Sequence, residues 1–268
     1  MFKDVKMGQN LKYFSLLCFL IILYVVGLLI FAKGFLLKRV VVERNSSCKV
    51  DFAMQSDMHG EKGCWMHVRY KKAVIIVIDA LRYDFVALDS SEDSSLHYKN
   101  KFTVIQNHLR KPNNAKLYKF IADPPTTTLQ RLKGLTTGSL PTFVDAGSNF
   151  ASSEIKEDNF IDQLISHQKR IKFLGDDTWI GLFPNRFQKQ FPFPSFNVKD
   201  LHTVDDGVLR HLYTEMGKSD WDVIVAHFLG VDHCGHRYGP NHPAMSEKLS
   251  QMNDMLRYTN CRISFITI

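Results

Sequence analysis

The stretch AVIIVI at residues 73–78, followed directly by Asp79, decides the fold of this chain. Its continuous run of mostly β-branched residues is typical of a strand that is buried on both faces of a parallel sheet. A second such run lies at residues 222–226, and residues 170–174 are a third candidate strand. Segments with helical character separate the runs, notably residues 160–169 and 204–216. The alternation predicts an α/β domain with a mixed or parallel sheet and helices on both faces.

The segment at residues 183–196 has a different character, because three prolines stand among its aromatic residues. Proline lacks a backbone N–H and has a fixed φ, which excludes it from helix interiors and central strands. We therefore expect this segment to be an ordered surface loop.

An uncharged, apolar segment occupies residues 13–32 near the N-terminus. About twenty such residues are enough for a helix to cross the hydrocarbon core of a bilayer. The segment is longer than the apolar part of a cleaved signal peptide, so we interpret it as an uncleaved signal anchor. Basic residues on both sides leave its orientation open. The N-glycosylation acceptor Asn45-Ser46-Ser47 favours a lumenal position for the chain that follows the anchor.

These features divide the chain into five expected parts. They are a cytosolic N-terminus at residues 1–12, a transmembrane anchor at 13–32, a juxtamembrane connection at 33–72, a folded domain at 73–257 and a tail at 258–268.

Charge and cysteine content exclude some classes of protein. The 268 residues include 34 basic and 27 acidic side chains, a net charge of +7 that is spread along the chain. A nucleic-acid-binding protein usually gathers its basic residues, so we expect no nucleic acid partner and instead a basic surface near anionic lipids. The five cysteines form no CxxC pair, which excludes a zinc ribbon. Cys48 and Cys64 flank a polar stretch and are a candidate disulfide in an oxidising compartment.

Two groups of polar residues suggest a reactive hydroxyl near a carboxylate. Asp79 follows a buried strand, where ligands bind at the carboxyl edge of a parallel sheet, although it is equally suited to cap the next helix. The sequence PPTTTL at residues 124–129 predicts a turn that leads into a helix. One threonine there is either an ordinary N-cap or a nucleophile held beside phosphate at the helix N-terminus. A hydroxyl needs a base or a metal ion to attack phosphorus near neutral pH.

Two further polar groups follow predicted strands. The sequence GVDHCGH at residues 230–236 offers Asp232 and His236, whose oxygen and nitrogen atoms are ligands that zinc accepts. A polar loop without metal is the alternative for this segment. Asp176 and Asp177 follow the strand at residues 170–174 and either orient a substrate or cap the next segment.

Together these segments resemble a known family. The matching segments are Asp-Ala-Leu-Arg-x-Asp after a strand, Pro-x-Thr-x-Thr before Leu-Thr-Thr-Gly-Ser-Leu-Pro-Thr-Phe, Gly-Asp-Asp-Thr-Trp, and His-Phe-Leu-Gly-Val-Asp-His-Cys-Gly-His-Arg-Tyr-Gly-Pro. In this order they resemble the GPI ethanolamine-phosphate transferases, from the apolar segment to about residue 257.

The resemblance implies an alkaline-phosphatase-like domain in the lumen of the endoplasmic reticulum, with two zinc ions. It implies transfer of ethanolamine phosphate from phosphatidylethanolamine to a mannose of the GPI precursor lipid, the third mannose being expected. It also implies residence in the endoplasmic reticulum membrane and a small membrane partner subunit.

The resemblance also implies roles for single residues. Asp79 and the attacking threonine would bind one zinc ion, and Asp232 and His236 would bind the other. Thr128 is the expected nucleophile because its hydroxyl is the last in a Thr-x-Thr pattern, and Thr126 is the alternative. The expected substrate-binding residues are Asp176, Asp177 and His233.

The sequence departs from the family after residue 257. The family's late Asp-His-Gly-Met motif, a further histidine and a bundle of transmembrane helices are not found in it. Each zinc ion would then have two protein ligands, whereas a catalytic zinc usually has three. We expect weak metal binding, an unpaired sheet edge and little or no activity of this chain alone. The alternatives are a non-catalytic lumenal fragment and a generic metal-dependent phosphodiesterase.

Overall fold

The structure is a computed structural model that describes residues 2–35, 44–47, 70–87, 95–111, 115–122, 124, 126–140 and 154–259. Within these residues, four strands form one sheet in the order β1-β4-β2-β3, and every neighbouring pair is parallel. The strands are β1 (Ala73–Ile78), β2 (Ile171–Asp176), β3 (Lys189–Phe193) and β4 (Val223–Phe228). The three strands expected from the sequence are confirmed, and β2 and β4 continue two residues further than expected.

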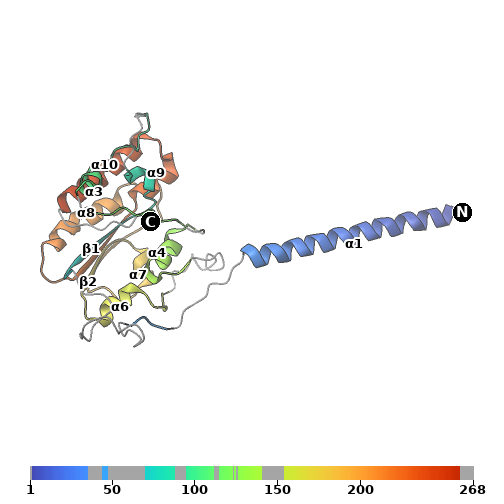
Figure 1. Ribbon diagram of the computed structural model, residues 1–268, viewed down its shortest axis with the longest axis horizontal. Helices are drawn as coiled ribbons and strands as arrows, with labels where there is room; N and C mark the ends of the chain where they lie inside the picture. The colour runs from blue at the N-terminus through green and yellow to red at the C-terminus, as the bar shows by residue number, and fades with distance from the viewer. Residues whose placement is uncertain are drawn as a thin grey trace, which may run out of the picture.

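Helices cover both faces of the sheet, as the sequence predicted (Figure 1). The first face packs against α2 (Tyr83–Val86), α3 (Thr103–Leu109), α8 (Thr203–Met216), α9 (Gly230–Tyr238) and α10 (Pro243–Thr259). The second face packs against α4 (Thr128–Thr137), α6 (Phe160–Ser166) and α7 (Thr178–Leu182). Successive side chains of a strand point to opposite faces, so Ile76 and Ile78 enter the first core and Val77 enters the second.

The loop that we expected over residues 183–196 is partly wrong, because β3 lies within it. Pro192 pairs with Gly175 of β2 in the parallel register. Proline is tolerated here because β3 is the last strand of the described sheet, so no further strand needs the missing N–H group. The sequence excluded a central strand correctly but missed an edge strand.

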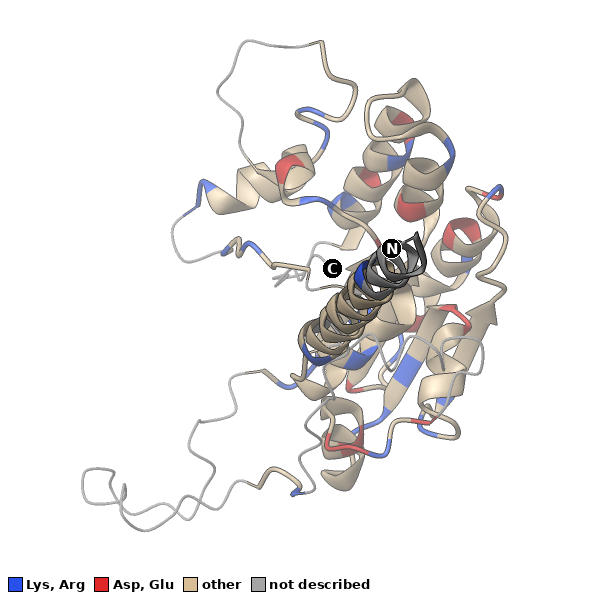
Figure 2. Ribbon diagram, turned by 90° about the vertical axis from the view of Figure 1, so that its right-hand side faces the viewer, with Lys and Arg blue, Asp and Glu red and all other residues tan. Residues whose placement is uncertain are grey.

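A buried ion-pair network joins β2, β3 and α8. Lys172 Nζ lies 2.7 Å from Glu215 Oε2, and Lys189 Nζ and Lys218 Nζ lie 2.8 and 2.6 Å from Glu215 Oε1. Burial alone would raise the pKa of Glu215, but hydrogen bonds from the three lysines outweigh it and lower the pKa to about 2. Elsewhere, basic and acidic side chains are interspersed over the described elements (Figure 2).

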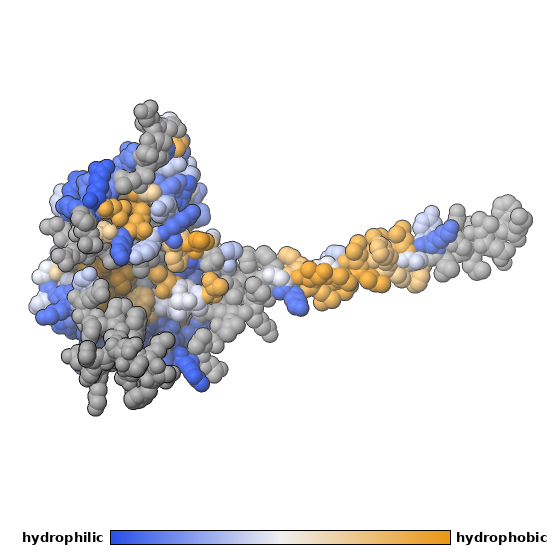
Figure 3. Space-filling model, in the orientation of Figure 1, coloured by the Kyte–Doolittle hydropathy of each residue, from blue (hydrophilic) through white to orange (hydrophobic). Residues whose placement is uncertain are grey.

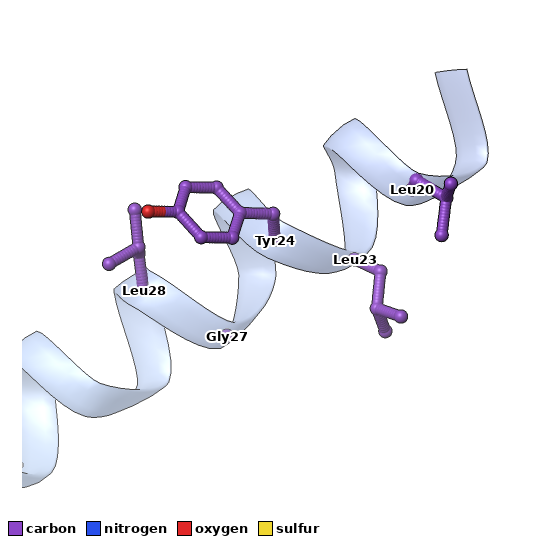
Figure 4. A pocket seen from close by; sticks show the side chains of 5 residues that line it. All are labelled: Leu20, Leu23, Tyr24, Gly27 and Leu28. Atoms are coloured by element: carbon purple, nitrogen blue, oxygen red, sulfur yellow. The ribbon is translucent and has the colours of Figure 1, made fainter. Parts of the chain in front are cut away.

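The first helix, α1 (Phe2–Phe35), extends away from the sheet domain (Figure 1). Its part from Lys12 to Gly34 is long and apolar enough to cross a membrane, judged by length and composition. Large exposed apolar side chains cover it along its length (Figure 3). A shallow hollow on this helix forms where Gly27 lacks a side chain, between Leu20, Leu23, Tyr24 and Leu28 (Figure 4).

Candidate active site at the carboxyl edge of the sheet

The topology of the sheet brings three of the predicted motifs to one edge. β1, β4 and β2 are parallel neighbours, so their carboxyl ends lie together. Asp79 follows β1, α9 follows β4, and Asp176 is the last residue of β2. The backbone N–H of Asp79 donates to the carbonyl of Phe228 at 3.0 Å, which fixes the end of β1 against the start of α9.

Asp79 is buried at this edge and uses both carboxylate oxygens. Its Oδ1 accepts a hydrogen bond from the backbone N–H of Ala80 at 2.9 Å, and its Oδ2 accepts one from the Thr128 hydroxyl at 2.8 Å. Ala80 has a φ of 53°, a left-handed conformation that is costly for alanine and is often found at functional sites. Asp79 is not the N-cap of the following helix, because that position in α2 belongs to Arg82.

Thr128 reaches Asp79 because it is the first residue of α4. Thr127 occupies the N-cap position with an extended backbone and makes no side-chain capping bond. The hydroxyl of Thr128 is therefore turned toward the carboxylate, and the helix N-terminus lies beside it. The structure leaves Thr126, the alternative nucleophile, exposed on the approach to the helix.

Asp232 and His236 lie one helical turn apart on α9, and the polar loop that was the alternative for this segment is excluded. The i, i+4 spacing puts both side chains on one face of the helix, with His236 Nε2 3.5 Å from Asp232 Oδ1. Burial raises the pKa of Asp232, the Asp79 carboxylate raises it further, and the imidazoles of His236, His233 and His227 oppose the shift. Because Asp79 follows β1 and α9 follows the neighbouring strand β4, the two pairs lie at the same edge of the sheet.

The donor types of the cluster fit zinc, since they comprise two carboxylates, an imidazole and a hydroxyl. The geometry provides them as two pairs, Asp79 with Thr128 and Asp232 with His236. Among the described residues, no group of three or more His, Cys, Asp or Glu side chains is arranged to hold a metal ion. The described part of the chain therefore offers two protein donors for each expected ion.

The residues expected to bind substrate have structural contacts of their own. Asp176 is 1% exposed, and its Oδ1 accepts the backbone N–H of Thr178 at 2.8 Å. Asp177 Oδ1 accepts the hydroxyl of Ser195 at 2.7 Å. His233 is buried, with Nδ1 2.7 Å from the carbonyl oxygen of Asp200. A substrate-binding role for Asp176, Asp177 and His233 stays a prediction.

Sequence reasoning missed two buried residues, one that faces Asp79 of the cluster and one that holds the N-terminus of α9. His227 of β4 lies with Nε2 3.7 Å from Asp79 Oδ2. Asp205 of α8 accepts the backbone N–H groups of Leu229 and Gly230, both at 3.0 Å, where α9 begins. The signal for His227 was present in the sequence, because an ionisable residue inside an apolar strand is rarely buried without a partner.

The segment at residues 44–47 lies against the sheet domain, in contact with residues that come more than 100 positions later in the sequence. The backbone N–H of Ser46 donates to Asp158 Oδ2 at 2.8 Å, and Gln163 Nε2 donates to the Ser46 carbonyl at 3.1 Å. Asn45, the predicted glycosylation site, is exposed beside these contacts. The predicted disulfide between Cys48 and Cys64 lies outside the described residues.

Several curated relatives of the chain share the name GPI ethanolamine phosphate transferase 3. GPI ethanolamine phosphate transferase 3, catalytic subunit, of Homo sapiens is 50% identical over 257 residues, which is 92% of this chain and 23% of that protein. GPI ethanolamine phosphate transferase 3 of Schizosaccharomyces pombe is 48% identical over 85% of this chain and 25% of its own length. The enzyme of that name from Saccharomyces cerevisiae is 45% identical over 94% of this chain and 24% of its own length. The chain thus spans about a quarter of the length of these relatives.

The resemblance to GPI ethanolamine-phosphate transferases that the motifs indicated is confirmed by these relatives. The family model of the type I phosphodiesterases / nucleotide pyrophosphatases also matches residues 98–259 of the chain. That range includes α4, β2, β4 and α9, the elements that build most of the cluster. The chain therefore belongs to the type I phosphodiesterase and nucleotide pyrophosphatase family.

Proposed function

We propose that the protein transfers ethanolamine phosphate from phosphatidylethanolamine to a mannose of the GPI precursor lipid, the third mannose being the expected acceptor. The observation that carries the proposal is the 2.8 Å hydrogen bond from the Thr128 hydroxyl to Asp79, beside Asp232 and His236 at one sheet edge. The names of the curated relatives support the transfer of ethanolamine phosphate to GPI.

Thr128 is the proposed nucleophile of a two-step reaction. The Thr128 hydroxyl loses its proton as its oxygen forms a bond to the phosphorus of phosphatidylethanolamine, the bond from phosphorus to the diacylglycerol oxygen breaks, and the diacylglycerol leaves as an alcohol after it gains a proton. The hydroxyl of mannose then attacks phosphorus, loses its proton and releases the Thr128 oxygen, which takes up a proton to restore the hydroxyl. Two displacements of this kind replace one difficult step. The N-terminus of α4, where Thr128 stands, favours the negative charge of the phosphoryl group.

Two zinc ions are the proposed cofactors, in agreement with a superfamily that is generally metal-dependent. Asp79 and Thr128 would hold one ion, and Asp232 and His236 would hold the other. When bound, the ions would lower the pKa of the attacking hydroxyl and stabilise charge on the phosphoryl group. Since a catalytic zinc usually has three protein ligands, we propose that the 268 residues alone bind zinc weakly and transfer little or nothing.

The proposed location is the membrane of the endoplasmic reticulum, with α1 as the anchor and the sheet domain in the lumen. Exposed apolar side chains along α1 and the exposed acceptor Asn45 support this arrangement. A small membrane subunit is the proposed protein partner.

The decisive experiment compares Thr128→Ala with Thr126→Ala in the whole protein. Both are expressed in cells that lack the endogenous transferase, and the ethanolamine phosphate content of the GPI precursor is measured by mass spectrometry. Thr128→Ala should lower transfer by about a thousandfold or more, because it removes the nucleophile. Thr126→Ala is the matched control and should keep most of the activity. Equal losses in both variants, or none in Thr128→Ala, would overturn the assignment.

Hydrolysis of phosphodiesters is the second candidate function, because the matching family model is that of phosphodiesterases. Water would then take the place of the mannose hydroxyl in the second step. Free phosphoethanolamine as the main product, in the presence of the GPI precursor, would favour hydrolysis over transfer.

A further inference from the structure

His227 is a buried histidine that the proposed reaction does not yet use. It lies on the central strand β4, and its residue is 0% exposed. Its side chain faces α7, where Trp179 is also fully buried. On the neighbouring strand, a Cβ at Gly175 would stand only 2.1 Å from the His227 carbonyl oxygen, so the backbone of β4 is held closely by β2.

Trp179 fixes the position of the ring proton of His227. The indole Nε1 donates a hydrogen bond to His227 Nδ1 at 3.0 Å. An indole N–H is a donor only, so Nδ1 must use its lone pair as the acceptor and carries no proton. The imidazole then takes the tautomer with its proton on Nε2.

The Nε2 atom points toward the cluster at the sheet edge. It is fully buried and has no hydrogen-bond partner within the described residues. The carboxylate oxygen Asp79 Oδ2 lies 3.7 Å from it. A buried N–H group without a partner is unfavourable, so a small approach to Asp79 is favourable.

The alternative arrangement has the opposite tautomer. Asp176 Oδ2 lies 3.7 Å from His227 Nδ1 and would accept a proton carried there. His227 would then present the lone pair of Nε2 to the cluster and serve as a metal ligand. The distances decide against it, because the Trp179 contact at 3.0 Å is a hydrogen bond and the Asp176 contact at 3.7 Å is too long to be one.

We infer that His227 is a positioning residue, whose Nε2–H group faces Asp79 Oδ2 across 3.7 Å and donates to it after a small approach, and which is itself held in the required tautomer by Trp179. This inference rests on the proposed function, in which Asp79 is a metal ligand. Asp79 Oδ2 would then be held by the hydroxyl of Thr128 on one side and by the imidazole of His227 on the other. Groups that orient a metal ligand in this way change metal affinity or activity by about 10- to 100-fold when they are removed.

The first test reads the tautomer directly and does not depend on activity. The full chain is labelled with 15N-histidine in detergent micelles, and long-range correlation spectra of the imidazole nitrogens are recorded, with His227 assigned by its loss in His227→Leu. The expected result is a protonated Nε2 and an unprotonated Nδ1. In Trp179→Phe, which keeps an aromatic ring but removes the indole N–H, the opposite tautomer should become populated. A protonated Nδ1 in the unmodified chain would overturn the inference.

The second test compares two replacements of His227 in the full chain. His227→Gln keeps a side-chain N–H donor, whereas His227→Leu has none. The dissociation constant of Zn²⁺ is measured by competition with a chromogenic chelator, and circular dichroism confirms that both variants fold. We expect zinc affinity to fall by about 10- to 100-fold in His227→Leu and by clearly less in His227→Gln. Equal affinity in all three proteins would overturn the inference.

The two tests separate this inference from the proposed function. If Thr128→Ala transfers normally in the whole protein while His227→Leu loses zinc affinity, the proposed reaction is wrong and the positioning role stands. If Thr128→Ala is inactive while His227→Leu binds zinc as the unmodified chain does, the positioning role is wrong and the proposed reaction stands.

Discussion

Gly175 is the residue on which the approach of β2 to β4 depends. Its φ is +132°, and a Cβ at this position would stand 2.1 Å from the carbonyl oxygen of His227. Any side chain would push the two central strands apart, next to Asp176 and His227. The glycine therefore contributes to the site through the space that it leaves.

Replacing Gly175 by alanine should lower the free energy of unfolding by about 2–4 kcal/mol, since it combines an unfavourable φ with a backbone clash. Chemical denaturation of the full chain in detergent measures the change. Gly138→Ala is the matched control, because Gly138 has a φ of +70° but open space around it. The control should cost only about 1 kcal/mol. Equal losses at both positions would show that the close approach of the strands is unimportant.

At the scale of elements, α9 is held at its N-terminus by a buried carboxylate. Asp205 Oδ1 accepts two backbone N–H groups there, and Asp205 Oδ2 accepts a bond from Lys248 Nζ of α10 at 3.2 Å. Asp205 and Lys248 are both buried. Because α9 carries Asp232 and His236, this ion pair fixes the helix that presents half of the candidate site.

Asp205→Asn should therefore destabilise the protein by about 3–5 kcal/mol, since the charge of Lys248 is left buried without its partner. Asparagine still accepts the two backbone bonds, so the loss reports on the ion pair. Adding Lys248→Met should recover much of the stability, because the unpaired charge is then removed. A double-mutant cycle with thermal or chemical unfolding measures this, and strictly additive losses would contradict the coupling.

The network around Glu215 makes the packing of β2, β3 and α8 depend on pH. The pKa of Glu215 is about 2 in the folded protein, below the ordinary value of 4.5. A carboxylate whose pKa is lowered by folding stabilises the folded protein at pH values above its pKa in the unfolded chain. This contribution is lost as the pH falls from about 4.5 to about 2. Glu215→Gln should thus lower the unfolding free energy at pH 7, and the difference from the unmodified chain should shrink below pH 4.

Unfolding curves of the unmodified chain and of Glu215→Gln, recorded from pH 7 to pH 3, check this prediction. Asp254→Asn is the control, because the pair of Asp254 with Arg257 is exposed and should contribute little at any pH. A constant difference between Glu215→Gln and the unmodified chain over this range would contradict it.

The elements that the sequence predicted well are those in which one physical signal dominates. An unbroken aliphatic run identified β1, because burial on both faces requires it. β3 was missed because Pro192 within it and Pro194 just after it argued against a strand, and only pairing with β2 permits one at the edge. Asp79, Asp232 and His236 were proposed as site residues because their motifs follow strands, and Thr128 because its motif leads into a helix, and the roles of all four stay predictions. His227 was missed because its partners, Trp179 and Asp79, are distant in sequence and meet only through the order of the strands.

At the scale of the whole molecule, the side of the membrane on which the domain lies can be tested with the one N-glycosylation acceptor of the sequence, Asn45-Ser46-Ser47. If the domain is lumenal, Asn45 carries a glycan, and treatment with an endoglycosidase increases electrophoretic mobility. Ser47→Ala should abolish this shift, because it removes the required hydroxyl. Ser46→Ala is the matched control and should keep it, since Ser46 contacts the domain through backbone atoms. A protein that never shifts in cells would contradict the lumenal orientation.

The contacts of Ser46 with Asp158 and Gln163 also shorten the free connection between α1 and the sheet domain. Only residues 36–43 separate the end of α1 from the segment at 44–47. A fully extended connection of this length would reach about 30 Å. If α1 spans a bilayer and the domain acts on lipids, as proposed, the domain meets its lipids by diffusion in two dimensions, at a high effective concentration. Tight binding of a lipid from solution would then be unnecessary. Lengthening the connection at residues 36–43 with a flexible insert should slow turnover while leaving the chemistry at Thr128 unchanged.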